Sequence, residues 1–289
     1  MRLTSPRSLY YLALLLLGML FIVIAADASR GMKRHEALPS WEEAMLAACE
    51  GTSPSEHVRC LKGYFTELTL RDSAREALKR AALLQQDGTI DDCHLAAHVI
   101  GETAMSQAED VGQALASCST SCLSGCSHGV MEEYIAEKGK TAVMPELLHM
   151  CADITDANAQ RECVHGVGHG MFAHGVLAYH DALVTCTAFP ARGEQDACID
   201  GVTMEAADQA LERGTDAFYA AIPHLCDAAA KESDPRFLNY CIRNVGEVTM
   251  FATGHDVAES EHYCTTLPAP YQEACSRAVY NEARQNRQL

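Results

Sequence analysis

The stretch CADITDANAQRECVHGVGHG, residues 151–170, contains the pattern on which the fold of this chain depends. Two cysteines enclose a polar connector, and the second one begins a run of glycines and histidines. Five cysteine pairs in the chain have this spacing, with partners 11 to 15 residues apart: Cys49/Cys60, Cys151/Cys163, Cys186/Cys198, Cys226/Cys241 and Cys264/Cys275. An even number of cysteines at regular spacing is typical of disulfides in an oxidising compartment. We therefore expect each pair to form a disulfide.

The second cysteines of these pairs recur along the chain with a nearly constant period. Together with Cys93 and Cys126 they lie at positions 60, 93, 126, 163, 198, 241 and 275, with gaps of 33, 33, 37, 35, 43 and 34 residues. Three residues after each comes a small or turn-forming residue: Gly63, Ala96, Gly129, Gly166, Gly201, Asn244 and Ala278. This period is close to that of two-helix repeats, and a small residue at a fixed helical position lets a neighbouring helix approach.

These observations predict an all-α fold, a solenoid-like array of about seven disulfide-stapled helical hairpins. We place the repeat domain at residues 49–289, after a linker and first helix start at 29–48. One helix of each hairpin should end near the first cysteine, as in Pro145–Ala152 or Asp216–Ala229. The other should begin at the second cysteine, as in Cys126–Glu137 or Cys198–Arg213, after connectors such as Asp153–Arg161 or Arg192–Asp196. The spacing resembles that of cysteine-stapled helical repeats of the Sel1-like kind, without their alanine and glycine consensus.

Four cysteines remain outside the five pairs. Cys93, Cys118, Cys122 and Cys126 allow three connectivities, and the sequence does not choose among them.

The N-terminal segment and the overall charge restrict the compartment and the partners. Arg2 and Arg7 precede 19 uncharged residues, 8–26, so residues 1–28 are predicted to be a cleaved signal peptide or a single transmembrane signal anchor. Either one places the remainder on the periplasmic or extracellular side, held at the membrane or exported. With 22 basic and 39 acidic residues the net charge is −17, which disfavours nucleic acid as a partner.

Histidines occupy equivalent positions in two adjacent central repeats. Two and six residues after the second cysteine lie His128 and Glu132 in one repeat, and His165 and His169 in the next. Residues four apart share one helix face, and equal positions of stacked repeats lie side by side. We expect these four side chains to converge as ligands of zinc, copper or iron, because imidazole and carboxylate groups suit these metals.

A further His-x3-His pair precedes the central repeats. His94 and His98 lie one and five residues after Cys93, which is one residue out of phase and turns them by roughly 100° on an α-helix. We rank them as secondary ligands. The remaining histidines are expected to be surface or core residues.

Two classes of function follow. The first is a metal-binding protein, with one or two metal ions and oxidase, hydroxylase or hydrolase chemistry. HEAT-repeat di-iron hydroxylases resemble this arrangement loosely, although they use adjacent His-Glu motifs; with zinc, Glu132 or Glu133 would serve as a base. The alternative is a non-catalytic repeat scaffold that binds a protein partner on its concave face.

Overall fold

The structure is a computed structural model that describes residues 40–90, 93–231 and 233–285, and these residues contain helices and no strands. Two units are distinguished along the chain, Met1–Ala44 and Met45–Leu289, and apart from residues 40–44 everything described below belongs to the second. The predicted segment 1–28 lies outside the described residues. Among the described helices, none is long and apolar enough to span a membrane.

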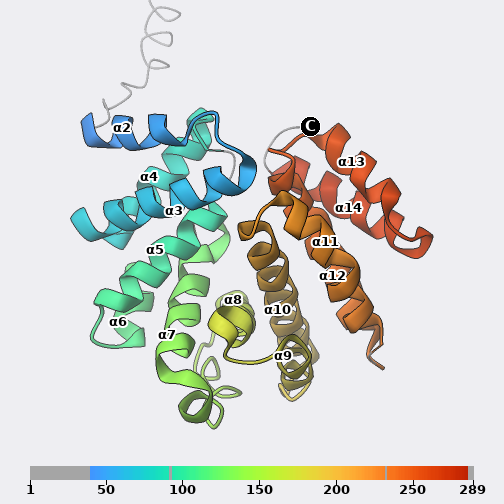
Figure 1. Ribbon diagram of the computed structural model, residues 1–289. Coiled ribbons are helices and arrows are strands. Elements are labelled where there is room, and N and C mark those ends of the chain that lie inside the picture. The colour runs from blue at the N-terminus through green and yellow to red at the C-terminus, as the bar shows by residue number, and fades with distance from the viewer. Residues whose placement is uncertain (1–39, 91–92, 232, 286–289) are drawn as a thin grey trace, which may run out of the picture. The chain divides into compact units, whose positions relative to one another are not determined.

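Seven helices form the core of the second unit, and each packs against the next in chain order. They are α3 (Pro54–Arg71), α5 (His94–Gln107), α7 (Gly125–Val143), α8 (Ala157–Phe172), α10 (Arg192–Glu212), α12 (Pro235–Ala252) and α14 (Ala269–Gln285). Helix α2 (Ser40–Cys49) precedes α3, and the other helices lie between the core helices in the chain: α4 (Ala74–Asp87), α6 (Val111–Ser117), α9 (Tyr179–Cys186), α11 (Thr215–Ala230) and α13 (Val257–Thr266). From α4 onward, each of these outer helices packs on the core helix that follows it (Figure 1). The all-α fold of helical hairpins is confirmed.

Six disulfides follow a single rule, in which the end of an outer element is joined to the beginning of its core helix. The five predicted pairs are present, with Cα–Cα distances of 5.4 to 5.9 Å. Cys118 at the end of α6 is joined to Cys126 in α7 in the same way. The seventh disulfide, Cys93–Cys122, departs from the rule because it joins the N-terminus of α5 to the turn before α7. Over the described residues no cysteine is free.

One predicted helix is absent, and several core helices begin earlier than expected. Residues 144–153 form successive turns in place of the helix Pro145–Ala152, with hydrogen bonds from His149 N to Glu146 O and from Ala152 N to His149 O. These bonds join residues three apart, so no α-helix propagates. Helices α8 and α10 start inside the predicted connectors, at Ala157 and Arg192, because Asp156 caps α8 and Glu194 accepts a hydrogen bond from the backbone N–H of Ala191.

Glycines allow the core helices to cross with their backbones almost in contact. A Cβ atom at Gly129 would lie 1.9 Å from the carbonyl oxygen of His98, and one at Gly201 would lie 2.1 Å from that of His165. Such distances exclude any side chain, so the small residue three positions after the cysteine is required at these crossings. Gly63 occupies the same position in α3, yet open space surrounds it.

A second set of glycines defines the true register of the core helices. In α5, α8 and α12 one glycine faces the carbonyl oxygen of the second cysteine in the following core helix, and a Cβ there would lie 2.0 to 2.6 Å from that oxygen. These glycines are Gly101, Gly168 and Gly246. Gly168 and Gly246 follow the cysteine of their own helix by five residues, whereas Gly101 follows Cys93 by eight. Cys93 therefore lies three residues before the position equivalent to Cys163.

The array also contains contacts between distant repeats. Helix α3 packs on α10 and α12 as well as on α5. Lys62 forms an ion pair with Glu212, and Arg59 Nη1 donates a hydrogen bond of 2.8 Å to the Glu212 carbonyl oxygen.

Candidate metal centre

Five imidazoles and one carboxylate from α5, α7 and α8 lie together in the second unit. Three groups of residues have potential ligand atoms within 4.8 Å of one another: His94/His98/His128, His128/His165/His169 and His98/Glu132/His169. All of these residues are buried except His94, which is partly buried. The six residues singled out in the sequence are thus brought together, whether or not they bind an ion.

One nitrogen of each imidazole lies near an oxygen atom at the periphery of the cluster. His94 Nδ1 is 3.0 Å from the Cys122 carbonyl oxygen, and His98 Nδ1 is 2.7 Å from Glu132 Oε1. The corresponding distances are 3.1 Å from His128 Nε2 to Glu162 Oε2, 3.5 Å from His165 Nδ1 to Asp200 Oδ2, and 3.1 Å from His169 Nδ1 to Glu205 Oε2. Glu132 Oε1 also lies 3.3 Å from His169 Nδ1.

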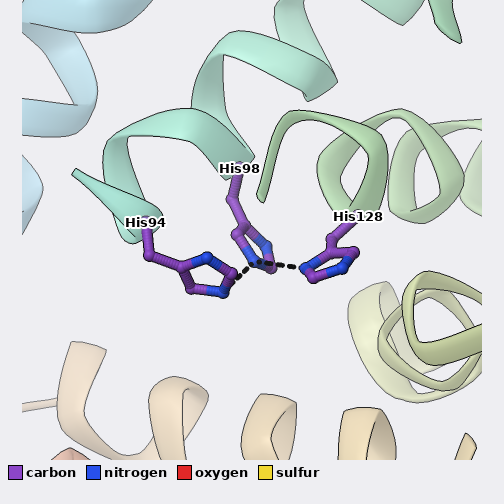
Figure 2. Close-up of side chains that lie close together, drawn as sticks. All are labelled: His94, His98 and His128. Carbon is purple, nitrogen blue, oxygen red and sulfur yellow. Dashed lines mark hydrogen bonds between the residues drawn. The ribbon is translucent and has the colours of Figure 1, made fainter. Parts of the chain in front are cut away.

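The other nitrogen of each imidazole faces the interior of the cluster. The two Nε2 atoms of His94 and His98 are 3.1 Å apart, and those of His165 and His169 are 3.0 Å apart. His128 Nδ1 is 3.4 Å from His98 Nε2. Figure 2 shows His94, His98 and His128 pointing toward one another from α5 and α7.

The structure brings His94 and His98 into the cluster, and the rotation expected for them rested on aligning Cys93 with the other second cysteines. With the three-residue correction, His98 and Glu102 occupy the positions that His128 and Glu132 hold in α7. His94 then lies one turn earlier on the same face. Cys93 is out of register because it forms the exceptional disulfide with Cys122.

Burial favours the uncharged form of three histidines of the cluster. Desolvation lowers the pKa of His98, His128 and His169 well below the ordinary value, and neighbouring imidazoles lower all three further. Neutral imidazole is the form that binds metal ions, so these side chains do not need to lose a proton first.

A group of carboxylates borders the cluster, and the sequence analysis identified only one of them. Burial raises the pKa of Glu132 well above its ordinary value, and the charges of Glu205 and Glu102 raise it further. A protonated Glu132 can donate the hydrogen bond that links it to Glu102. The raised pKa of Glu205 likewise comes from burial. Lys62 is the cation whose charge acts on all three carboxyl groups.

Charged side chains fix the opposite border of the cluster. Burial alone would raise the pKa of Glu162, but its hydrogen bond with His128 and the charge of Arg161 lower it to about 2. Asp200 is 2% exposed, forms an ion pair with Arg243 and accepts a 3.1 Å hydrogen bond from Asn244 Nδ2. Asp200 occupies the His128 position in α10, so the repeat alignment alone would have placed it beside His165.

A pocket of about 690 Å³ opens onto the cluster. Three of the histidines line it, namely His94, His128 and His165, and polar side chains of α8, α10, α12 and α14 complete its wall. Its charged residues comprise five acids and two arginines: Asp156, Glu162, Asp200, Glu247, Glu282, Arg161 and Arg243. A molecule in this pocket would reach the imidazoles directly.

The backbone beside His94 has an unusual conformation. Cys122, Leu123 and Ser124 have φ angles of 54°, 52° and 62°, three consecutive residues other than glycine in the left-handed region. Such residues are rare there, because their Cβ atoms crowd the following carbonyl oxygen. Leu123 is 62% exposed and, with Ser124, lines the pocket.

The remaining histidines among the described residues do not join the cluster. His149, His174, His224 and His262 are exposed.

Comparisons of the chain with protein-family models, with curated proteins and with solved structures find no match.

Proposed function

We propose that this protein binds one transition-metal ion per chain through three or four of the inward nitrogens that five histidines present, namely His94, His98, His128, His165 and His169. The observation that carries the proposal is the two-sided environment of every imidazole, with oxygen at the periphery and nitrogen in the interior. Histidines that bind metals almost always donate their second N–H to a carboxylate or a backbone carbonyl. Four of the five have such an oxygen within 3.1 Å, and His165 Nδ1 lies 3.5 Å from Asp200 Oδ2 without a hydrogen bond.

The spacing of the inward nitrogens fits a coordination sphere. Ligand nitrogens about 2.1 Å from a tetrahedral ion lie about 3.4 Å from one another. The distances of 3.1 Å from His94 to His98, 3.0 Å from His165 to His169 and 3.4 Å from His128 to His98 lie within a few tenths of an ångström of this value. Little movement of the helices would therefore be needed for an ion to bind.

The stoichiometry follows from His128, which belongs to both histidine triads. The Nε2 atom of His128 lies 3.1 Å from Glu162 Oε2, within hydrogen-bond distance, so only Nδ1 of this ring remains to bind an ion. The two triads therefore cannot be filled at the same time through His128. In this proposal Glu132 orients His98 and His169 through their Nδ1 atoms, in place of the ligand role expected from the sequence.

An all-imidazole ligand set suits copper, zinc, nickel or iron. Because affinities of divalent ions in such sites generally peak at Cu²⁺, we expect Cu²⁺ to bind more tightly than Zn²⁺ or Co²⁺. An ion held by three or four imidazoles keeps a position open toward the pocket, where it can act as a Lewis acid or a redox centre. The metalloenzyme hypothesis rests on this access.

The seven disulfides indicate an oxidising, extracytoplasmic environment. We propose that residues 1–28 direct the chain there and, if they are retained, attach it to the membrane.

Metal analysis of untagged protein tests the proposal. The wild type should contain about one equivalent of copper or zinc after loading and gel filtration, the number that the single shared His128 allows. His98→Gln combined with His169→Gln should lose this metal, because each triad then lacks a ligand. His149→Gln combined with His224→Gln is the matched control, since both side chains are exposed, and it should retain the metal.

The opposite result has a definite meaning. A folded wild-type protein that retains no metal, and whose stability is unchanged in the His98 and His169 variant, would overturn the proposal. The non-catalytic scaffold would then be the better interpretation.

A further inference from the structure

The Cys93–Cys122 disulfide and the histidine cluster meet at a single side chain. Cys93 immediately precedes His94 and lies at the N-cap of α5. The carbonyl oxygen of Cys122 lies 3.0 Å from His94 Nδ1. A carbonyl oxygen only accepts hydrogen bonds, so Nδ1 carries the proton and Nε2 presents its lone pair to the cluster. One disulfide thus fixes both the backbone from which His94 projects and the atom that orients its ring.

The segment that supplies this carbonyl adopts a conformation that needs external support. Cys122, Leu123 and Ser124 are all left-handed, and the exposed Leu123 packs little of its side chain. Residues held in such regions persist only where the surrounding structure imposes them. Here the covalent links at Cys122 and at Cys126 enclose the segment on both sides. Without the bond to Cys93, the segment loses the link to α5 that holds its carbonyl over His94.

This disulfide is also among the most accessible in the described part of the chain. Both cysteines are buried in each of the four disulfides between Cys151 and Cys275, whereas Cys122 is only partly buried. Exchange requires a thiolate to reach a disulfide sulfur, so access decides which bond reacts first. Cys49–Cys60 and Cys118–Cys126 also contain a partly buried cysteine, but neither contacts a histidine nitrogen of the cluster.

We propose that the Cys93–Cys122 disulfide positions His94 for metal binding, and that its reduction by a dithiol weakens the metal site. The inference rests on the proposed metal function and adds a means of regulating it. A thiolate of the dithiol attacks the Cys122 sulfur, forms a mixed disulfide and releases Cys93 as a thiolate, which takes up a proton. The second thiol of the reductant then closes its own disulfide and frees Cys122. Two electrons and two protons pass from the dithiol to the protein.

The test compares Co²⁺ binding to five forms of the full chain, the wild type and four variants. Co²⁺ is suitable because its visible absorption reports the coordination number and geometry of the ion and because thiols do not reduce it. Cys93→Ser with Cys122→Ser should weaken Co²⁺ binding about 10-fold or more, the usual effect of removing a group that orients a metal-binding histidine. Cys264→Ser with Cys275→Ser, which opens a disulfide between α13 and α14, should leave the affinity within about twofold, since it touches no ligand.

A combined variant separates positioning from general destabilisation. His94→Gln alone should weaken Co²⁺ binding, and adding it to Cys93→Ser/Cys122→Ser should cause little further loss, because both changes act on the same ligand. Independent, multiplying losses would overturn the positioning role, and so would unchanged affinity and absorption in the Cys93/Cys122 variant. A wild-type protein that fails to bind Co²⁺, Zn²⁺ and Cu²⁺ would refute the metal function itself. The two failures are therefore distinguishable.

Alkylation after limited treatment with a dithiol tests the selectivity. Mass spectrometry should detect labelled Cys93 and Cys122 before any label appears in the four buried disulfides. Labelling of these disulfides at the same rate would contradict preferential reduction.

Discussion

Helices α5, α7 and α8 form a first group and α10, α12 and α14 a second. Both groups pack in the same way, but they differ in the side chains that face inward. Gly101, Gly168 and Gly246 face a cysteine carbonyl in the next core helix on both sides of this division. Two and six residues after the register position, which is Ala96 in α5, Cys126 in α7 and Cys163 in α8, the first group has histidine with glutamate or histidine. The second group has Asp200 with Met204, Arg243 with Glu247, and Arg277 with Asn281. Cysteines and glycines therefore determine the backbone, and two positions per repeat determine the chemistry.

Removing a disulfide from the second group should destabilise the protein without affecting the metal. Cys226→Ser with Cys241→Ser opens a loop whose ends are 15 residues apart, which should lower the free energy of unfolding by about 3 kcal/mol. Denaturant titration measures this loss, and metal analysis of the same samples should show unchanged content. Loss of metal in this variant would mean that the two groups of helices do not have separate roles.

Removing the metal should lower the stability of the protein through the first group of helices, which holds the histidine cluster. With free metal at a hundredfold excess over its dissociation constant, binding should stabilise the wild type by about 2.7 kcal/mol relative to chelated protein. Thermal unfolding with and without a chelator gives this difference. The His98→Gln/His169→Gln variant should show no response to the chelator, and an equal response there would place the ion elsewhere.

Glycines at equivalent positions should respond to alanine in opposite ways. Gly129→Ala forces a Cβ against the His98 carbonyl and should lower the free energy of unfolding by about 2 kcal/mol. Gly63→Ala meets open space in helix α3 and should raise it by about 1 kcal/mol through helix propensity. Urea titrations of the two variants compare the positions directly, and a loss of stability in both would show that α3 is packed more tightly than described.

The smallest expected effect concerns Asp234, whose partner Arg236 forms an ion pair between α12 and α10. The hydrogen bonds from Arg236 lower the pKa of Asp234, which also caps α12, and Arg236 reaches Asp196 of α10. A lowered pKa stabilises the fold above the unfolded value of 3.8, and this contribution is lost as pH falls through the folded value. Because Asn still caps a helix, Asp234→Asn should cost less than about 1 kcal/mol at pH 7.

The same difference should shrink at a second pH well below 3.8, because the wild-type carboxyl loses its charge as the pH falls through its lowered pKa. Chemical denaturation of both proteins at the two pH values checks this. A cost that persists unchanged at acidic pH would mean that the charge of Asp234 is not its cause.

The fold was predictable because its determinants are local and repeated. Cysteine spacing identified the five disulfides, and two of the small residues three positions after a cysteine, Gly129 and Gly201, lie at close helix crossings. The turns at 144–153 were misread as a helix because apolar residues at helical spacing do not reveal bonds between residues three apart. The cluster His128, Glu132, His165 and His169 was predictable from equal positions in adjacent repeats.

The remainder of the site depends on register and on partners from other helices. The spacing of Gly101 from Cys93 was a signal that His98 and Glu102 repeat the pattern of His128 and Glu132, but only a contact between backbones gives it meaning. Glu162 and Glu205 are not among the repeated positions, and they are recognised only through the distances to His128 and His169. Pairing of Cys93 with Cys122 likewise required the structure.

The ion pair between Lys62 and Glu212 has a consequence for how the chain folds. Arrays in which each repeat touches only its neighbours can gain and lose structure one unit at a time. A contact between residues 150 positions apart cannot form until α10 has been synthesised, and it adds a costly loop closure to the search for the native state. Once this contact has formed, α3 should unfold together with α10 and α12. The first repeat should therefore acquire its native protection from hydrogen exchange late, and it should lose that protection together with the fifth.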